Sequence, residues 1–321
     1  MGKRESKIAT SESVHEISKE GAFVRQNNYF TTPFGDGENE LPVEANRYRL
    51  LWAPICPWAH RQIIAIHLLG LQGVIGIGTA NPVRTEKGWE FSLDEGGVDP
   101  VLGIRYLPEI YERTDPNYTG RATVPTVVDV KTGKVVNNDY FKLTNYWESV
   151  WVKYHKKEAP DLYPVELRAE IDKLNDVIFH AVNNGVYKAG FAQSQEAYEK
   201  AYDVLFARLD ELEQRLATQR YLFGNHITDS DIRLYVTLAR FDIAYYPVFR
   251  TNRNRIIDFP NLWGYARDLY QTPGFGSTTD FDAIKRGYHL GNHAANPYQI
   301  LAKGPDLGIW STPHNREILL K

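Results

Sequence analysis

The stretch Arg47-Tyr-Arg-Leu-Leu-Trp-Ala-Pro-Ile-Cys56-Pro57-Trp58-Ala59-His60-Arg61 holds the single cysteine of the 321-residue chain. The residues before Cys56 favour a strand, and residues 62–69 favour an amphipathic or buried helix that ends at Gly70. Pro57 fits the first helical turn, where a missing N–H costs nothing. We therefore expect Cys56 at a helix N-terminus, where free N–H groups and the helix dipole favour the nucleophilic thiolate.

Cys56 has two interpretations. A lone cysteine is commonly a small buried apolar residue, whereas the helix start and the neighbouring His60 and Arg61 favour a reactive thiol supported by positive charge. Position 59 is Ala, so the Cys-x-x-Cys spacing is absent. Disulfide chemistry at Cys56 would therefore need an external thiol to resolve it.

The composition limits the classes of partner. A formal net charge of −3 gives no basic excess for binding nucleic acid. One cysteine excludes a disulfide scaffold and suits a reducing compartment. The sequence shows neither a secretory signal nor an apolar run of membrane-spanning length. We therefore expect a cytoplasmic protein with no nucleic-acid or membrane partner.

Nine histidines raise the question of a metal site. His289 and His293 are four residues apart, but their Gly- and Asn-rich surroundings offer neither a clear helix nor a carboxylate or thiolate ligand. No phosphate-binding loop, complete dinucleotide fingerprint or serine elbow occurs. The sequence thus favours thiol chemistry without a metal.

The first half of the chain has the element order of the thioredoxin fold. Strands are expected at 48–53 and 74–80 around a helix at 57–69, which implies a parallel pair. A helix at about 101–112, a hairpin turning at Gly133 and a helix at 140–155 follow. Pro125 stands at the start of the first hairpin strand, where proline is tolerated. In that fold, a cis proline facing the cysteine holds the backbone of a thiol substrate.

The second half is predicted to be helical, with helices at 166–181, 195–218 and 260–270. Thr228 and Asp231 have capping-box spacing, so we expect Asp231 to cap a buried helix rather than act as a catalytic acid. The predicted parts are an arm at 1–45, a thioredoxin-like domain at 46–155, a linker at 156–165, an all-helical domain at 166–275 and a mostly irregular tail at 276–321.

A cleft between the two domains is the expected ligand site. Tyr187 and Tyr288 are candidates for contacting an aromatic ligand, because each lies near glycines that let a ligand approach. Simple packing is the other interpretation of both tyrosines.

The chain resembles the glutathione transferases, and most closely the glutathionyl-hydroquinone reductases, the xi class. The motifs that carry the resemblance span most of the chain. They include Phe23-Val-Arg25, Cys56-Pro-Trp-Ala-His-Arg61, Gly88-Trp-Glu-Phe91, Thr123-Val-Pro125, Gly185-Val-Tyr-Lys-Ala-Gly-Phe-Ala192, Arg240-Phe-Asp242 and Asn296-Pro297.

The resemblance implies specific roles. Cys56 corresponds to the family's nucleophile, Trp89 and Val124-Pro125 to glutathione-binding positions, and Tyr187 and Tyr288 to tyrosines that contact the hydroquinone. It also implies glutathione as co-substrate and a homodimer.

Two departures from the family pattern lie in the ligand site. Where the family has Asn-Glu-Ser to hold the γ-glutamyl group of glutathione, this chain has Asn138-Asp139-Tyr140. Where it has two adjacent tyrosines followed by Ser-His, this chain reads Tyr288-His289-Leu-Gly-Asn-His293.

The leading functional hypothesis is glutathione-dependent reduction of glutathionyl-hydroquinones through a Cys56–glutathione mixed disulfide. The alternatives are a broader thioltransferase or dehydroascorbate reductase, and a non-catalytic protein that binds such ligands.

Overall fold

The computed structural model describes residues 16–291 and 296–319. Its first half contains one mixed sheet in the order β2-β1-β3-β4. The strands are β1 (Tyr48–Trp52), β2 (Gly76–Thr79), β3 (Thr126–Asp129) and β4 (Lys134–Asn137). β1 pairs in parallel with β2 and antiparallel with β3, and β3 and β4 form an antiparallel hairpin. The predicted thioredoxin-like fold of this half is confirmed.

Helix α1 (Pro57–Leu69) has the predicted bounds. Twelve of its thirteen residues are buried, with His67 the exception, as expected for a helix that packs on all sides. Gly70 ends it in the left-handed region at φ 75°, where glycine carries no steric penalty. Strand, turn and helix thus place Cys56 at the junction of β1 and α1.

The helix predicted to begin near residue 101 begins later, as α2 (Leu107–Thr114). Pro108 lies in its first turn, and the Glu109 carboxylate accepts from the backbone N–H of Tyr106 at 2.9 Å. Proline is unfavourable in a helix interior and favourable in a first turn, so the helix begins beside Pro108 and not near residue 101. The next helix is also shorter than predicted, with α3 (Leu143–Ser149) followed by a 3₁₀ turn.

The second half is helical, as predicted. Its helices are α4 (Arg168–Ile178), α5 (Gly185–Gly190), α6 (Gln195–Arg215), α7 (Asp229–Arg240), α8 (Tyr246–Val248), α9 (Pro260–Gln271) and α10 (Phe281–Leu290). Single π-helical turns, η4 (Phe179–Asn183) and η5 (Phe241–Tyr245), follow α4 and α7. Thr228 and Asp231 form the predicted capping box at the start of α7.

The presence of α10 corrects the expectation for the tail. Asp280 caps this helix by accepting from the Ala283 N–H at 2.9 Å. Gly287 lies inside the helix, where a Cβ would stand 2.2 Å from the Ile55 side chain. Glycine therefore lets α10 approach the residue that precedes Cys56, a reason that local sequence does not reveal.

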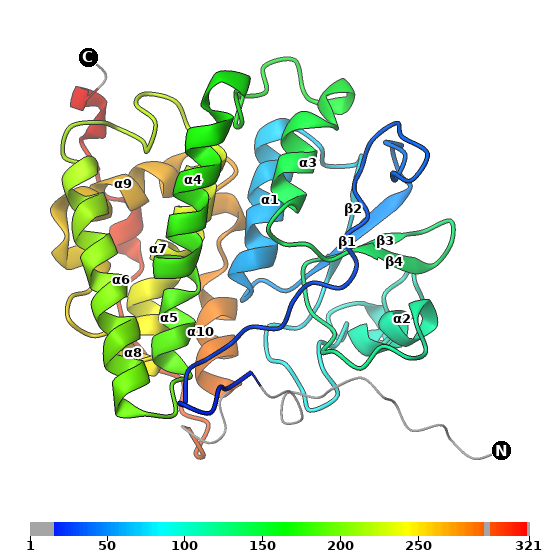
Figure 1. Ribbon diagram of the computed structural model, residues 1–321, viewed down its shortest axis with the longest axis horizontal. Helices are drawn as coiled ribbons and strands as arrows, with labels where there is room; N and C mark the ends of the chain where they lie inside the picture. The colour runs from blue at the N-terminus through cyan, green and yellow to red at the C-terminus, as the bar shows by residue number, and fades with distance from the viewer. Residues whose placement is uncertain (1–15, 292–295, 320–321) are drawn as a thin grey trace.

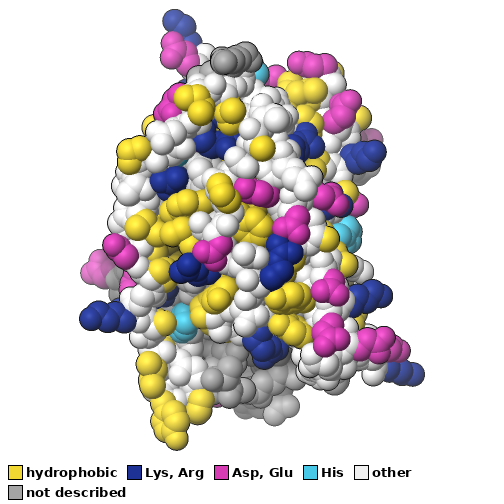
Figure 2. All heavy atoms as spheres, turned by 90° about the vertical axis from the view of Figure 1, so that its left-hand side faces the viewer, with side chains coloured by type: hydrophobic (Ala, Val, Ile, Leu, Met, Phe, Trp, Pro, Cys, Tyr) yellow, Lys and Arg dark blue, Asp and Glu magenta, His cyan; other side chains and the backbone are white. Residues whose placement is uncertain are grey.

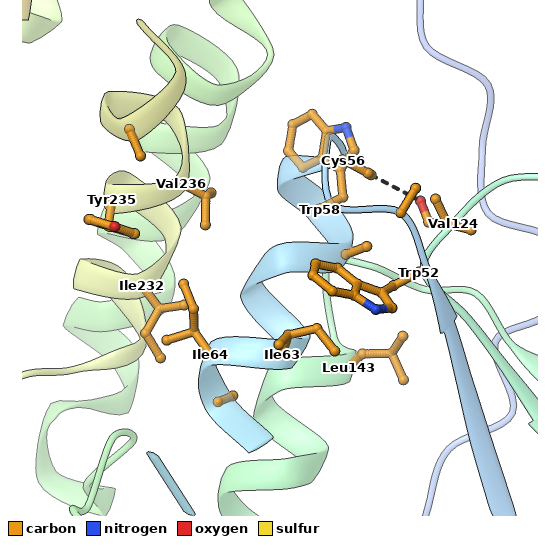
Figure 3. Close-up of a cluster of buried hydrophobic side chains, with 14 of the residues drawn as sticks. Trp52, Cys56, Trp58, Ile63, Ile64, Val124, Leu143, Ile232, Tyr235 and Val236 are labelled. Atoms are coloured by element: carbon orange, nitrogen blue, oxygen red, sulfur yellow. Dashed lines mark hydrogen bonds between the residues drawn. The ribbon is translucent and has the colours of Figure 1, made fainter. Parts of the chain in front are cut away.

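Helix α1 joins the two halves. It packs against α3 on the sheet side and against α7 on the helical side, and it lies between the sheet and the helical layer in Figure 1. Figure 3 shows Ile232 of α7 turned toward Ile64 of α1. No helix in the described part of the chain is long and apolar enough to cross a membrane.

The arm that precedes β1 runs along the junction of the two halves (Figure 1). At one end the Gly21 carbonyl accepts from the N–H of Gln193, near the start of α6. At the other, the Phe30 carbonyl accepts from the N–H of Asn138, just after β4. The arm is thereby fixed to both halves of the molecule.

Candidate active site

Cys56 is the N-cap of α1, with extended backbone at φ −73° and ψ 115°. Its Sγ donates to the Val124 carbonyl at 3.4 Å, the contact drawn in Figure 3. The Val124-Pro125 bond is cis. The structure thus brings three predicted site residues, Cys56, Val124 and Pro125, together from two separate loops of the thioredoxin-like fold.

The protonation state of Cys56 differs from the sequence expectation. Cys56 is only 8% exposed, and burial raises the pKa of its thiol. The backbone N–H groups of Ala59 and Trp58 and the charges of Arg240 and Arg25 act in the opposite direction. Burial outweighs them, so the free protein holds a thiol that donates to Val124. A helix start alone does not make Cys56 a thiolate.

His60 does not provide the positive charge that its position next to Cys56 suggested. Its side chain is fully buried, and burial followed by the charge of Arg240 lowers its pKa well below the usual range. Its Nε2 lies 2.9 Å from Thr278 Oγ1, and its Nδ1 lies 3.2 Å from an Nη1 of Arg240. The ring is therefore neutral and faces the helical half.

Arg61 is also buried and faces the helical half. Its Nη2 donates to Asn183 Oδ1 at 2.7 Å, and its guanidinium lies 4.8 Å from the centroid of the Trp58 ring. Burial, reinforced by Arg233, lowers its pKa. Its suggested support of the thiolate stays a prediction.

Two arginines that sequence reasoning did not single out influence Cys56. Arg25, from the arm, donates to Asn184 Oδ1 at 2.9 Å and lies 4.8 Å from the rings of both Trp58 and Tyr187. Arg240, the last residue of α7, donates to the carbonyls of Pro54 and Ile55. Both occur in motifs that the family resemblance includes, and that presence was the only sequence signal for them.

Tyr187 and Tyr288 lie together, although they come from α5 and α10. Their hydroxyl groups are hydrogen-bonded to each other, and both contact the hydroxyl of Tyr245, at 3.4 Å and 3.1 Å. We call these three residues the tyrosine cluster. The Tyr187 ring lies 6.0 Å from that of Trp58, which is two residues after Cys56. Sequence reasoning missed Tyr245, because a tyrosine in an aromatic-rich helix carries no local signal.

The segment that departs from the family pattern lies beside α1. The Tyr140 ring is 5.1 Å from that of Trp58 and 6.1 Å from that of Phe179. The Asp139 carboxylate accepts from the Asn28 side chain at 3.0 Å and from the Phe141 N–H at 3.1 Å. Asp139 is thus held by the arm and by its own loop, while Tyr140 contributes an aromatic wall.

Trp89 is half-buried, and its carbonyl accepts from the N–H of Leu107 at 2.9 Å. Its role stays a prediction. Among the described residues, no group of three or more His, Cys, Asp or Glu side chains is arranged to hold a metal ion. His289 contacts the Ile243 carbonyl, and His293 lies outside the described residues.

In this site a cysteine at a helix start faces a cis proline, and the helical half of the molecule faces the same cysteine. This arrangement defines a glutathione transferase. The family model "Glutathione S-transferase, C-terminal domain" matches residues 195–268. Glutathionyl-hydroquinone reductase YqjG of Escherichia coli is 40% identical over 288 residues, which cover 89% of this chain and 87% of that protein.

Solved structures give the same relationship. A glutathione transferase from Gordonia bronchialis is 52% identical with a TM-score of 0.89, and 91% of each chain is covered. The glutathione-bound structure of YqjG is 39% identical with a TM-score of 0.84, covering 93% of this chain and 98% of the other. The Xi enzyme of Phanerochaete chrysosporium is 36% identical with a TM-score of 0.87, covering 92% and 96%. The chain belongs to the xi-class glutathione transferases, the family of the glutathionyl-hydroquinone reductases.

Proposed function

We propose that the protein reduces glutathionyl-hydroquinones to hydroquinones at the expense of glutathione. The observation that carries the proposal is the position of Cys56, between the Val124-Pro125 backbone and the aromatic residues around Trp58. The side formed by the Val124-Pro125 backbone suits a thiol ligand with a peptide backbone, and the side formed by the aromatic residues suits a planar ring. Family membership supports the same reaction, since the relative YqjG is a glutathionyl-hydroquinone reductase.

The proposed reaction has two steps at sulfur, first an attack on the thioether sulfur of the substrate and then a thiol–disulfide exchange. In the first, the Cys56 thiolate attacks the glutathione sulfur of the substrate. A sulfur–sulfur bond forms, the bond from sulfur to the aromatic carbon breaks, and that carbon takes up a proton as the hydroquinone leaves. In the second, the thiolate of another glutathione attacks the mixed disulfide. Oxidised glutathione leaves, and Cys56 returns to its reduced state.

The other site residues have proposed binding roles. Val124 and Pro125 would pair with the glutathione backbone, and Trp89, Asp139 and Tyr140 would hold its remaining parts. Tyr187 and Tyr288 would hydrogen-bond to the hydroxyl groups of the hydroquinone, because their own hydroxyl groups already gather in one place.

Cys56→Ser tests the proposal. Oxygen is a far weaker nucleophile than a thiolate at neutral pH, so turnover of a glutathionyl-hydroquinone should fall by roughly a thousandfold or more. Serine is close in size to cysteine, so glutathione binding measured by calorimetry should stay near the wild-type value. Substantial turnover by this variant contradicts the proposal.

A broader thioltransferase is the second candidate, since Tyr140 changes the wall beside Cys56 relative to the family pattern. The same relay would act on a small mixed disulfide. Comparing kcat/KM on a glutathionyl-hydroquinone and on a glutathione mixed disulfide of a small thiol separates the two. A clear preference for the mixed disulfide favours the thioltransferase.

We also propose a cytoplasmic homodimer. A free cysteine that works with glutathione suits a reducing compartment. The face of the helical half in Figure 2 carries apolar side chains gathered between charged ones, which is consistent with a contact surface. Light scattering on the purified protein gives the oligomeric state, and a monomer at micromolar concentration contradicts the dimer.

A further inference from the structure

Arg240 connects the helical half to the loop that carries Cys56. It is fully buried at the end of α7. Its Nε donates to the Ile55 carbonyl at 2.8 Å, and one Nη donates to the Pro54 carbonyl at 2.9 Å. These are the two peptide carbonyls directly before Cys56. A single side chain from α7 therefore fixes the backbone from which the nucleophile projects.

The geometry requires the planar fork of a guanidinium. The remaining Nη donates to the Val236 carbonyl of α7 itself, at 2.8 Å. The fork thus binds two successive carbonyls of one half while it is anchored to the other half. A lysine ammonium has the same charge, but it cannot reach these three acceptors in one plane.

The contact with His60 leaves the positive charge of Arg240 uncompensated. The Nη1 of Arg240 donates to the Nδ1 of His60 at 3.2 Å. The Nε2–H of His60 then donates to Thr278 Oγ1 at 2.9 Å, because that hydroxyl uses its own proton on the carbonyl of Gly274 or Phe275. The two partners define a neutral imidazole with its proton on Nε2. Every hydrogen-bond partner of Arg240 in the described part of the chain is neutral, so no ion pair cancels its charge.

We propose that Arg240 is a positioning residue for Cys56, which both fixes the preceding backbone and supplies a buried positive charge that favours the thiolate. This inference rests on the proposed function of Cys56 as the nucleophile. It assigns to the helical half a part in activating the thiol.

Arg25 of the arm is the other charge that lowers the pKa of Cys56. Three further titratable groups face the thiol closely enough that a charge on Cys56 raises their own pKa, and they are Arg61 of α1, Arg121 of the loop before β3 and Tyr187 of α5. Among the charged groups, Arg240 opposes the effect of burial on the thiol most strongly. Removing it should therefore shift the titration of Cys56 even though the other arginines remain.

The test uses Cys56 as its own probe. Because Cys56 is the only cysteine, the rate of alkylation by iodoacetamide reports on this thiol alone. The rate is measured against pH for the wild-type protein and for Arg240→Met and Arg240→Lys, with turnover of a glutathionyl-hydroquinone measured in parallel. Arg286→Met is the matched control, since Arg286 is exposed and its ion pair among the described residues is with Asp282 on the surface of α10.

Arg240→Met should move the alkylation midpoint upward by about one pH unit, because the thiolate loses a nearby charge. Arg240→Lys should have an alkylation midpoint close to that of the wild type. Its kcat should be about tenfold lower, since one ammonium cannot fix both carbonyls. Arg286→Met should match the wild type in both measurements. A purely structural role for Arg240 would lower stability without moving the midpoint in folded protein.

A folded Arg240→Met variant with an unchanged midpoint overturns the inference. If that variant does not fold, Arg240→Lys decides, and wild-type kcat in the lysine variant overturns the positioning role. The alkylation profile needs neither glutathione nor hydroquinone. If the proposed function is wrong, the wild-type protein shows no turnover. If this inference is wrong, the alkylation midpoint of folded Arg240→Met is unchanged, so the two failures are distinguishable.

Discussion

The capping carboxylate of α7 gives a prediction whose size follows from the structure. Asp231 is fully buried, and its two oxygens accept four hydrogen bonds. Oδ1 accepts from the Leu222 N–H at 3.0 Å and the Tyr265 hydroxyl at 2.8 Å. Oδ2 accepts from the N–H and the hydroxyl of Thr228, at 2.8 Å and 2.9 Å. The substitution Asp231→Asn replaces one of these acceptors with an amide nitrogen.

The cost of Asp231→Asn follows from counting donors. The Tyr265 or Thr228 hydroxyl can rotate and accept from the new amide, but a backbone N–H cannot. Whichever way the amide is turned, one buried N–H loses its acceptor, which costs about 1–3 kcal/mol. The remaining hydrogen bonds are weaker because their acceptor is no longer charged. Removing the buried charge also removes its desolvation cost, which offsets part of that loss. We expect the free energy of unfolding to fall by about 2–4 kcal/mol.

Urea denaturation followed by circular dichroism measures the change. Asp258→Asn is the matched control, because Asp258 caps a short 3₁₀ turn in the same way and lies at the surface. It should cost about 1 kcal/mol or less. Folded Asp231→Asn should keep its kcat within about twofold, as expected of a residue that acts only on stability. An unchanged free energy of unfolding, or a lost kcat in fully folded protein, refutes the reasoning.

Two further predictions concern a buried acid and the tyrosine cluster. Burial raises the pKa of Asp242 to about 6, from a model-peptide value near 3.8. The folded state therefore holds this proton more tightly, and folding stability should fall by about 3 kcal/mol in total as the pH rises from well below 3.8 to well above 6. In urea titrations at several pH values, Asp242→Asn should lack that part of the pH dependence of stability. Identical stability profiles for the variant and the wild type would contradict this prediction. Tyr245→Phe removes two hydroxyl contacts while keeping the ring, so KM for a glutathionyl-hydroquinone should rise about three- to tenfold. An unchanged KM would remove Tyr245 from the substrate site.

Local patterns were sufficient for the features that depend on neighbouring residues. The strand-turn-helix around Cys56, the bounds of α1 and the capping role of Asp231 each depend on residues within a few positions of one another. Hydrophobic periodicity, proline in a first turn and glycine past a helix end are short-range effects. The sequence therefore determined the fold class and the place of the cysteine.

Tertiary structure decided the chemical state of Cys56. The helix start favours the thiolate, but burial beneath distant segments favours the thiol, and only the folded chain shows which effect is larger. His60 looked like a source of charge and is neutral, because it is buried against Arg240. The charges that do act on Cys56, from Arg25 and Arg240, come from the arm and from α7.

The partners of Cys56 were beyond sequence reasoning for the same reason. The tyrosine cluster gathers from α5, η5 and α10, and α10 itself depends on Gly287 fitting against Ile55. Desolvation and electrostatic interactions depend on distance in space and not on separation in the chain. The sequence by itself thus placed the cysteine at its helix start, and the packing of the two halves decided which groups surround it and in which form it rests.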